Sequence, residues 1–145
     1  MQPHQCVPLI LCEAAGEALQ MLPMLRQLGF EGTVAILTDE CDLPYECPPL
    51  TKEYLSGDKR DLARTLIRPP EFWPERAIDV IRQIRVSRVD PVRKLVMTTG
   101  GRAVEYGSLI WAAGGRARRL SCLGAEASNL FCVRGRGDAD AVVAR

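Results

Sequence analysis

Runs of apolar residues separated by polar turns predict alternating strands and helices in the N-terminal part of the chain. Residues 5–12 predict a buried strand, although Pro8 lacks the amide that a central strand donates. Residues 14–28 place apolar side chains at helical spacing, and Gly29 is typical of a helix end. Residues 33–37 are β-prone and apolar, so they predict a second strand. This order predicts a βαβ unit.

From Ala77 onward, apolar and polar residues alternate, which favours half-buried strands. The strands expected in this half of the chain are residues 78–89, 95–97, 103–105, 108–113 and 129–134. Short helices are expected within 56–64, from the Pro-rich segment at 68–73, and at 138–143. We predict a three-layer α/β fold with parallel strands near 7–12, 33–37 and 108–112, and a small antiparallel β-meander near 84–105.

The composition of the chain argues against several classes of function. The 145 residues are 47% hydrophobic and 26% charged, which is ordinary for a single globular domain. The net charge of +1 gives no electrostatic basis for binding nucleic acid or a membrane surface. No apolar run approaches the roughly 20 residues of a membrane span, and the short N-terminal apolar run lacks a basic flank. We therefore expect a cytoplasmic protein.

The six cysteines form no CxxC pair, and His4 is the only histidine. A structural zinc site needs closely spaced ligand pairs, so no metal site is expected. Free, reduced thiols are the expected state. A thiol-based redox sensor that uses Cys41 and Cys47 is a weaker alternative.

Asp39 and Glu40 directly follow the second predicted strand. In nucleotide-binding α/β folds, an acid at this position accepts a hydrogen bond from a ribose hydroxyl. A Pro-rich loop then leads to Lys52, and the fixed φ angles of Pro48 and Pro49 limit where that lysine can lie. These residues are candidates for a nucleotide site.

The same residues resemble the FAD-binding N-terminus of NAD(P)H-dependent ferredoxin reductases of the putidaredoxin-reductase and dioxygenase-reductase type. That family belongs to the pyridine nucleotide–disulfide oxidoreductase superfamily. The segments that carry the resemblance are Phe-Glu-Gly at 30–32, Asp39-Glu40, Leu-Pro-Tyr at 43–45, Pro-Pro-Leu-Thr-Lys at 48–52, Arg-Pro-Pro-Glu-Phe-Trp at 68–73, Ala-Ala-Gly-Gly-Arg at 112–116, and 129–143 around Arg134.

The resemblance implies a partial Rossmann-like FAD/NAD(P)-binding fold. Residues 1–145 would be the N-terminal segment of that domain, with the NAD domain and the C-terminal domain absent. FAD is the implied cofactor, whereas no NAD(P)H site is expected on this chain. The implied partners are a ferredoxin and a second polypeptide that completes the reductase.

The resemblance also assigns cofactor-binding roles to individual residues, whereas it leaves the catalytic residues unknown. Asp39 or Glu40 would hold the adenosine ribose, and Lys52 would lie against the phosphate or isoalloxazine side of FAD. The Val86 backbone would meet the adenine. The implied cofactor-binding residues are Ala15, Gly16, Asp39, Glu40, Lys52, Val86, Gly114 and Arg134.

Several residues depart from the family pattern at cofactor positions. Glu13 and Ala15 replace glycines of the pyrophosphate turn, Cys47 replaces an arginine, and Ala113 replaces a threonine. Pro23 lies in the middle of the predicted helix, where proline kinks or breaks the helix. We therefore expect weak FAD binding or none. The chain is either the FAD-binding portion of an oxidoreductase or a truncated, non-catalytic remnant or scaffold, and the visible spectrum separates the two.

Overall fold

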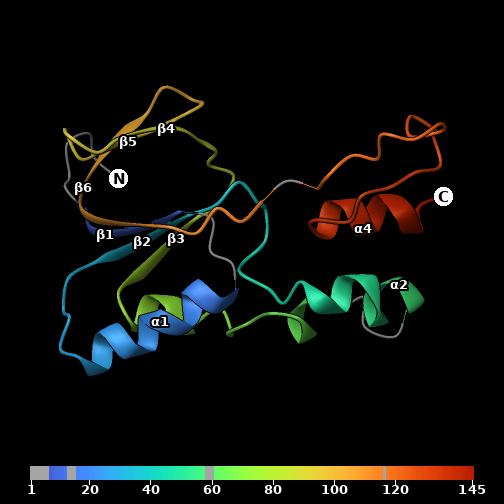
Figure 1. Cartoon of the computed structure of the whole chain (residues 1–145). Helices are drawn as coiled ribbons and strands as arrows, with labels where there is room; N and C mark the ends of the chain where they lie inside the picture. Colours follow the sequence, from blue (N-terminus) through green and yellow to red (C-terminus); the bar gives the residue numbers. More distant parts are fainter. Residues whose placement is uncertain (1–6, 13–15, 58–60, 116) are drawn as a thin grey trace. The chain divides into compact units, whose positions relative to one another are not determined.

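The computed structural model describes residues 7–12, 16–57, 61–115 and 117–145 (Figure 1). The described chain divides into two compact units. The first comprises Met1–Pro44 and Ile67–Gly114, and the second comprises Tyr45–Leu66 and Gly115–Arg145. None of the helices in the described ranges is long and apolar enough to cross a bilayer.

The first unit is built around a six-stranded sheet with the strand order β3-β2-β1-β6-β5-β4. The strands are β1 (Val7–Cys12), β2 (Val34–Leu37), β3 (Ile78–Ile81), β4 (Val86–Asp90), β5 (Leu95–Thr98) and β6 (Ala103–Trp111). The pairs β3-β2, β2-β1 and β1-β6 are parallel, whereas β6-β5 and β5-β4 are antiparallel. The predicted pairing of the first two strands in one sheet is confirmed.

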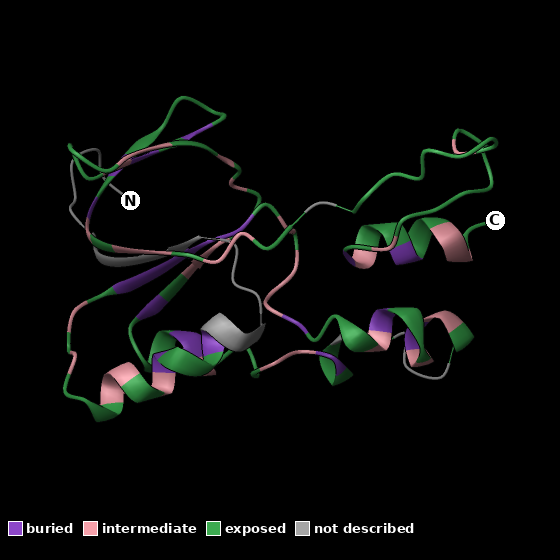
Figure 2. Cartoon of the chain, viewed as in Figure 1, coloured by how far each residue is buried: buried purple, intermediate pink, exposed green. Residues whose placement is uncertain are grey.

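Alternate residues of β2 pack on opposite faces and so define three layers. Val34 and Ile36 face a cluster that includes Leu19 and Leu22 of helix α1 (Gly16–Gln27). Ala35 and Leu37 face a second cluster formed with Val96, Val104 and Tyr106 of the meander strands. All four β2 residues are buried, as the purple ribbon in Figure 2 shows. The predicted three-layer α/β core is therefore confirmed.

Helix α1 ends at Gln27, and Gly29 lies just beyond it as the stop signal that the sequence predicts. Gly29 adopts φ +84°, and hydrogen bonds run from Gly29 N–H to Arg26 O and from Phe30 N–H to Leu25 O. This is a Schellman motif. Pro23 lies inside α1 without ending it, so of the two effects expected of this proline, a kink or a break, the break is not found. The Arg26 side chain donates to the carbonyls of Gly32 and Arg76 at 2.9 and 2.7 Å, which ties the helix end to two loops.

Two predictions of strand boundaries need correction. The single strand expected at 78–89 is two strands, β3 and β4, because the chain turns at Gln83, which adopts φ +58°. The separate strands expected at 103–105 and 108–113 form one continuous strand, β6. β6 pairs with β5 over 103–105 and with β1 over 106–111, so it changes neighbour without a break.

The second unit is helical, with a small core of Tyr45, Leu50, Tyr54 and Ala139. The helices that follow α1 in the chain are η1 (Pro48–Thr51), α2 (Glu53–Ser56), η2 (Leu62–Arg64), α3 (Phe72–Glu75) and α4 (Arg136–Val143); of these, α3 belongs to the first unit. The helix expected at 138–143 is confirmed. In place of the strand expected at 129–134, a turn closes from Leu130 N–H to Ala127 O, and no described strand pairs with this segment.

Candidate functional site

Four strands of the first unit end at one edge of the sheet. Cys12 at the end of β1 is paired with Leu37 of β2 and Trp111 of β6, and Leu37 is paired with Ile81 of β3. The chain order reverses at β1, since β2 and β3 lie on one side and β6 lies on the other. In open α/β sheets, ligands bind outside the carboxyl ends of the strands at such a switch point. This edge is therefore the candidate site.

Asp39 lies at this edge, two residues beyond β2, and its side chain is 34% exposed. One carboxylate oxygen, Oδ2, accepts hydrogen bonds from Arg85 Nε at 3.2 Å and from Arg85 Nη2 at 3.0 Å. Among the described residues, the other oxygen, Oδ1, has no hydrogen-bonding partner. The strand-end acid therefore retains one acceptor for a ligand.

The backbone around Asp39 is fixed by the segment that follows β3. Ile84 N–H donates to Thr38 O at 2.8 Å, and Gln83 N–H donates to Glu40 O at 3.0 Å. Glu40 N–H donates to the hydroxyl oxygen of Thr38, which is buried. The turn that carries Asp39 is thus held on both sides before any ligand arrives.

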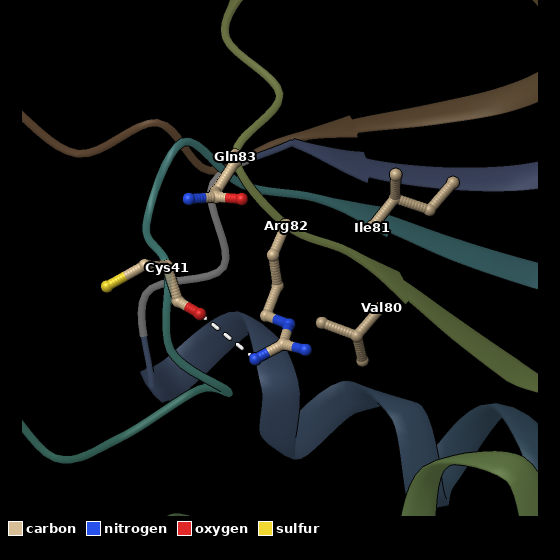
Figure 3. Close-up of a pocket in the computed structure, with 5 residues that line it drawn as sticks. All are labelled: Cys41, Val80, Ile81, Arg82 and Gln83. Carbon is tan, nitrogen blue, oxygen red and sulfur yellow. Dashed lines mark hydrogen bonds between the residues drawn. The ribbon is translucent and has the colours of Figure 1, made fainter.

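An open pocket of about 520 Å³ lies beside this turn at the end of β3. Its lining residues are Cys41, Val80, Ile81, Arg82 and Gln83. In Figure 3 the Arg82 side chain reaches the Cys41 backbone, where Nη1 donates to the carbonyl oxygen at 3.0 Å. The pocket combines an apolar strand end with the cationic side chain of Arg82 and the amide of Gln83.

Three further predicted residues lie in the first unit. Gly16 is the first residue of α1, and Ala15 lies outside the described residues. Gly114 follows β6 with φ +63°, a left-handed conformation that glycine adopts without strain. Val86 begins β4 and pairs with Thr98. The structure thus brings Asp39, Glu40 and Gly114 to the carboxyl edge of the parallel strands.

Lys52 and Arg134 belong to the second unit. Lys52 is exposed and precedes α2, and its N–H donates to Pro49 O at 3.0 Å. Arg134 is exposed, and its N–H donates to Asp138 Oδ2 at 2.8 Å, next to the start of α4. The cofactor contacts expected of these two residues stay predictions.

A polar network in the second unit was not expected from the sequence. The Tyr54 hydroxyl donates to Asp140 Oδ1, and Arg136 Nε donates to Asp140 Oδ2 at 3.3 Å. The hydrogen bond to Asp140, together with burial, raises the pKa of Tyr54 above its usual 10.0. Arg136 N–H donates to the Tyr45 hydroxyl at 2.8 Å. The network joins α2 and the segment before it to α4.

Arg85 is the residue of the site that the sequence did not reveal. It lies 46 positions from Asp39, so no local spacing links the two. The available signal is its place directly before Val86, in a stretch where the alternation of apolar and polar residues predicts a half-buried strand. Only the pairing of the turn after β2 with the segment after β3 brings them together.

Comparison with known proteins identifies the relatives of this chain. No protein-family model matches it. A ferredoxin–NAD(P)+ reductase from a Sphingomonas species is 51% identical over 120 residues, covering 83% of this chain and 29% of the relative. The ferredoxin reductase subunit of a 5,5′-dehydrodivanillate O-demethylase from a Sphingobium species is 49% identical over 121 residues, with coverage of 83% and 29%.

The solved structures that are similar to this chain include reductases of the same kind. A ferredoxin reductase from Rhodopseudomonas palustris superposes with a TM-score of 0.82 at 30% identity, covering 94% of this chain and 34% of that structure. The covalent putidaredoxin reductase–putidaredoxin complex superposes with a TM-score of 0.82 at 25% identity, covering 99% of this chain and 34% of that one. The chain spans about a third of the length of the proteins that it matches. It therefore corresponds to one segment of the ferredoxin reductases of the putidaredoxin-reductase type.

Proposed function

We propose that this chain is the FAD-binding portion of an NAD(P)H-dependent ferredoxin reductase-like flavoprotein. The observation that carries the proposal is the open Oδ1 acceptor of Asp39 at the carboxyl edge of the parallel strands. An acid there serves ribose recognition, and Gly114 allows the backbone to turn at the same edge. These residues fit the adenosine part of FAD, the cofactor of the homologous reductases.

Each predicted residue then has a defined task. Asp39 accepts a hydrogen bond from a ribose hydroxyl, with Glu40 beside it, and the Val86 backbone meets the adenine. Gly16, at the start of α1, places free backbone N–H groups near the pyrophosphate. The family resemblance also assigns cofactor contacts to the cations Lys52 and Arg134, which belong to the second unit. When bound, FAD supplies the conversion between hydride and single-electron transfer, while the protein positions it.

The electron-carrier partner is proposed from the relatives. Putidaredoxin is the partner in one matching structure, and the closely similar sequences are named as ferredoxin reductases. We propose a protein of that small electron-carrier class as the acceptor. We also propose that a second polypeptide supplies the NAD(P)H-binding part.

One observation favours the alternative of a non-catalytic scaffold. Cys47 stands where the family motif has an arginine, and its side chain is an exposed free thiol. This substitution removes one cation from the proposed flavin site. A colourless purified protein that stays colourless after incubation with FAD would support the scaffold.

The proposal is tested by titrating the protein with FAD and following flavin fluorescence. Asp39→Ala removes the ribose acceptor and is expected to weaken binding by about 1.5–3 kcal/mol, the range for a hydrogen bond to a charged group. Asp79→Ala is the matched control, because Asp79 is an exposed carboxylate within β3 whose side chain makes no hydrogen bond or ion pair with the described residues.

Lys52→Ala is expected to weaken binding more at low salt than at high salt, since screening reduces an exposed charge contribution. FAD affinity that is equal in the wild type, Asp39→Ala and Lys52→Ala at both salt concentrations would contradict the proposed site.

A further inference from the structure

One oxygen of the Asp39 carboxylate accepts hydrogen bonds from a protein partner, and the other oxygen is open to a ligand. Both hydrogen bonds from Arg85 go to Oδ2, and Oδ1 has no partner among the described residues. A guanidinium that places two donors on one oxygen restrains the carboxylate more than a single ammonium does, because its donors form a rigid planar fork. The contact therefore selects one orientation of the carboxylate.

The backbone holds Arg85 itself in place. The two preceding residues, Gln83 and Ile84, donate to the carbonyls of Glu40 and Thr38 on either side of Asp39. On the other side, Arg85 O accepts a hydrogen bond from Thr99 N–H at 2.9 Å, in the turn that follows β5. Arg85 thus bridges the turn after β2 and the turn after β5.

The ion pair between Arg85 and Asp39 contributes little to the free energy of folding. The side chains of Arg85 and Asp39 are 67% and 34% exposed, and exposed ion pairs contribute little to folding. A restrained acceptor does, however, affect ligand binding, because a free side chain loses rotational freedom when a ligand immobilises it. The Arg85–Asp39 ion pair therefore affects ligand recognition more than the stability of the fold.

We propose that Arg85 is a positioning residue for the ribose acceptor: it holds Asp39 through Oδ2 and so presents Oδ1 to a ribose hydroxyl. The inference rests on the proposed function for its ligand. It does not require Arg85 to touch the cofactor. Arg85 acts through Asp39, so its effect depends on the presence of that carboxylate.

The first test needs no ligand. Three-bond Hα–Hβ couplings, measured by NMR on the full chain, report the side-chain rotamer of Asp39. We expect a single rotamer in the wild type and averaged couplings in Arg85→Met. Arg85→Lys should be intermediate, since an ammonium replaces the fork with a single charge. Averaged couplings in the wild type, or an unchanged rotamer in Arg85→Met, would overturn the proposal.

The second test is a double-mutant cycle with FAD as the ligand. Arg85→Met should weaken FAD binding about 3- to 10-fold when Asp39 is present, the effect of freeing one side chain. It should have no effect in the Asp39→Ala background. Arg93→Met removes the same charge from the β4–β5 hairpin, where its side chain has no partner among the described residues, and should change affinity less than about twofold.

The outcomes separate the two proposals. Unchanged or tighter binding by Arg85→Met contradicts the positioning role, as does equal weakening in both backgrounds, which would mean that Arg85 acts on the cofactor directly. If the wild type does not bind FAD, the proposed function fails, and the rotamer measurement alone decides whether Arg85 positions Asp39.

Discussion

At the scale of single residues, unusual backbone angles mark the places where the chain of the first unit changes direction. Gly29 ends α1 with φ +84°, and Gly114 turns the chain after β6 with φ +63°. Ala77 and Lys94 also adopt positive φ, of 50° and 53°, although they carry side chains. Each of these two immediately precedes a strand, β3 or β5. Left-handed residues thus set where these strands begin.

Replacing Gly29 tests this assignment. Gly29→Ala is expected to lower the free energy of unfolding by about 1 kcal/mol, because a β-carbon disfavours the left-handed conformation. Its Cβ meets nothing within 4 Å, so the effect comes from the backbone alone. Gly115→Ala is the control, since Gly115 has equally open surroundings without a positive φ. Urea denaturation measures both, and equal losses would refute the backbone explanation.

The raised pKa of Tyr54 makes the free energy of unfolding depend on pH in the alkaline range. Its pKa is raised above 10.0 by the hydrogen bond to Asp140 and by burial, so the folded state holds the phenolic proton more tightly than the unfolded state does. This contribution is fully present below about pH 10 and is lost as pH rises through the raised value.

We therefore expect the free energy of unfolding to fall less steeply above pH 10 in Tyr54→Phe than in the wild type. Denaturation at a series of alkaline pH values measures the slopes. Tyr106→Phe is the control, because the Tyr106 hydroxyl makes no hydrogen bond with the described residues. A slope that Tyr54→Phe leaves unchanged would show that another group titrates.

At the scale of elements, apolar runs were sufficient to predict β1, β2 and α1, because a buried strand or helix face must be apolar along its length. Apolar runs were insufficient where a strand changes its neighbouring strand. β6 is continuous because its residues pass from β5 to β1, and no apolar pattern records a change of neighbour. Conversely, the alternation through 78–89 hides a turn, since Ile84 is apolar but lies between β3 and β4.

Helix α1 contains a proline, Pro23, at an interior position. Pro23 cannot donate to Leu19 O, and an interior proline costs about 3 kcal/mol relative to alanine. Pro23→Ala is expected to raise the free energy of unfolding by about 1–3 kcal/mol, measured by chemical denaturation. Pro69→Ala, which lies outside a helix, should lower it by a few tenths to about 1 kcal/mol. A loss of stability in Pro23→Ala would show that the proline ring packs usefully.

At the scale of the whole chain, the candidate site combines what the sequence could and could not indicate. The position of Asp39 was predictable because an acid after a buried strand must lie at the strand's carboxyl end. Its partner Arg85 was not, because their contact depends on how distant turns pair. The cofactor roles of Lys52 and Arg134, which lie in the second unit, stay predictions from family resemblance.

The most direct test of the proposed flavin site is an amide chemical-shift map of the full chain titrated with FAD. A flavin site at this edge predicts shifts that saturate together at residues 38–40, 83–86 and 112–114, the segments that meet at or next to the carboxyl edge of the sheet. Residues 91–94 of the β4–β5 hairpin should not move. Saturating shifts elsewhere, with 38–40 and 112–114 unaffected, would contradict a flavin site at this edge.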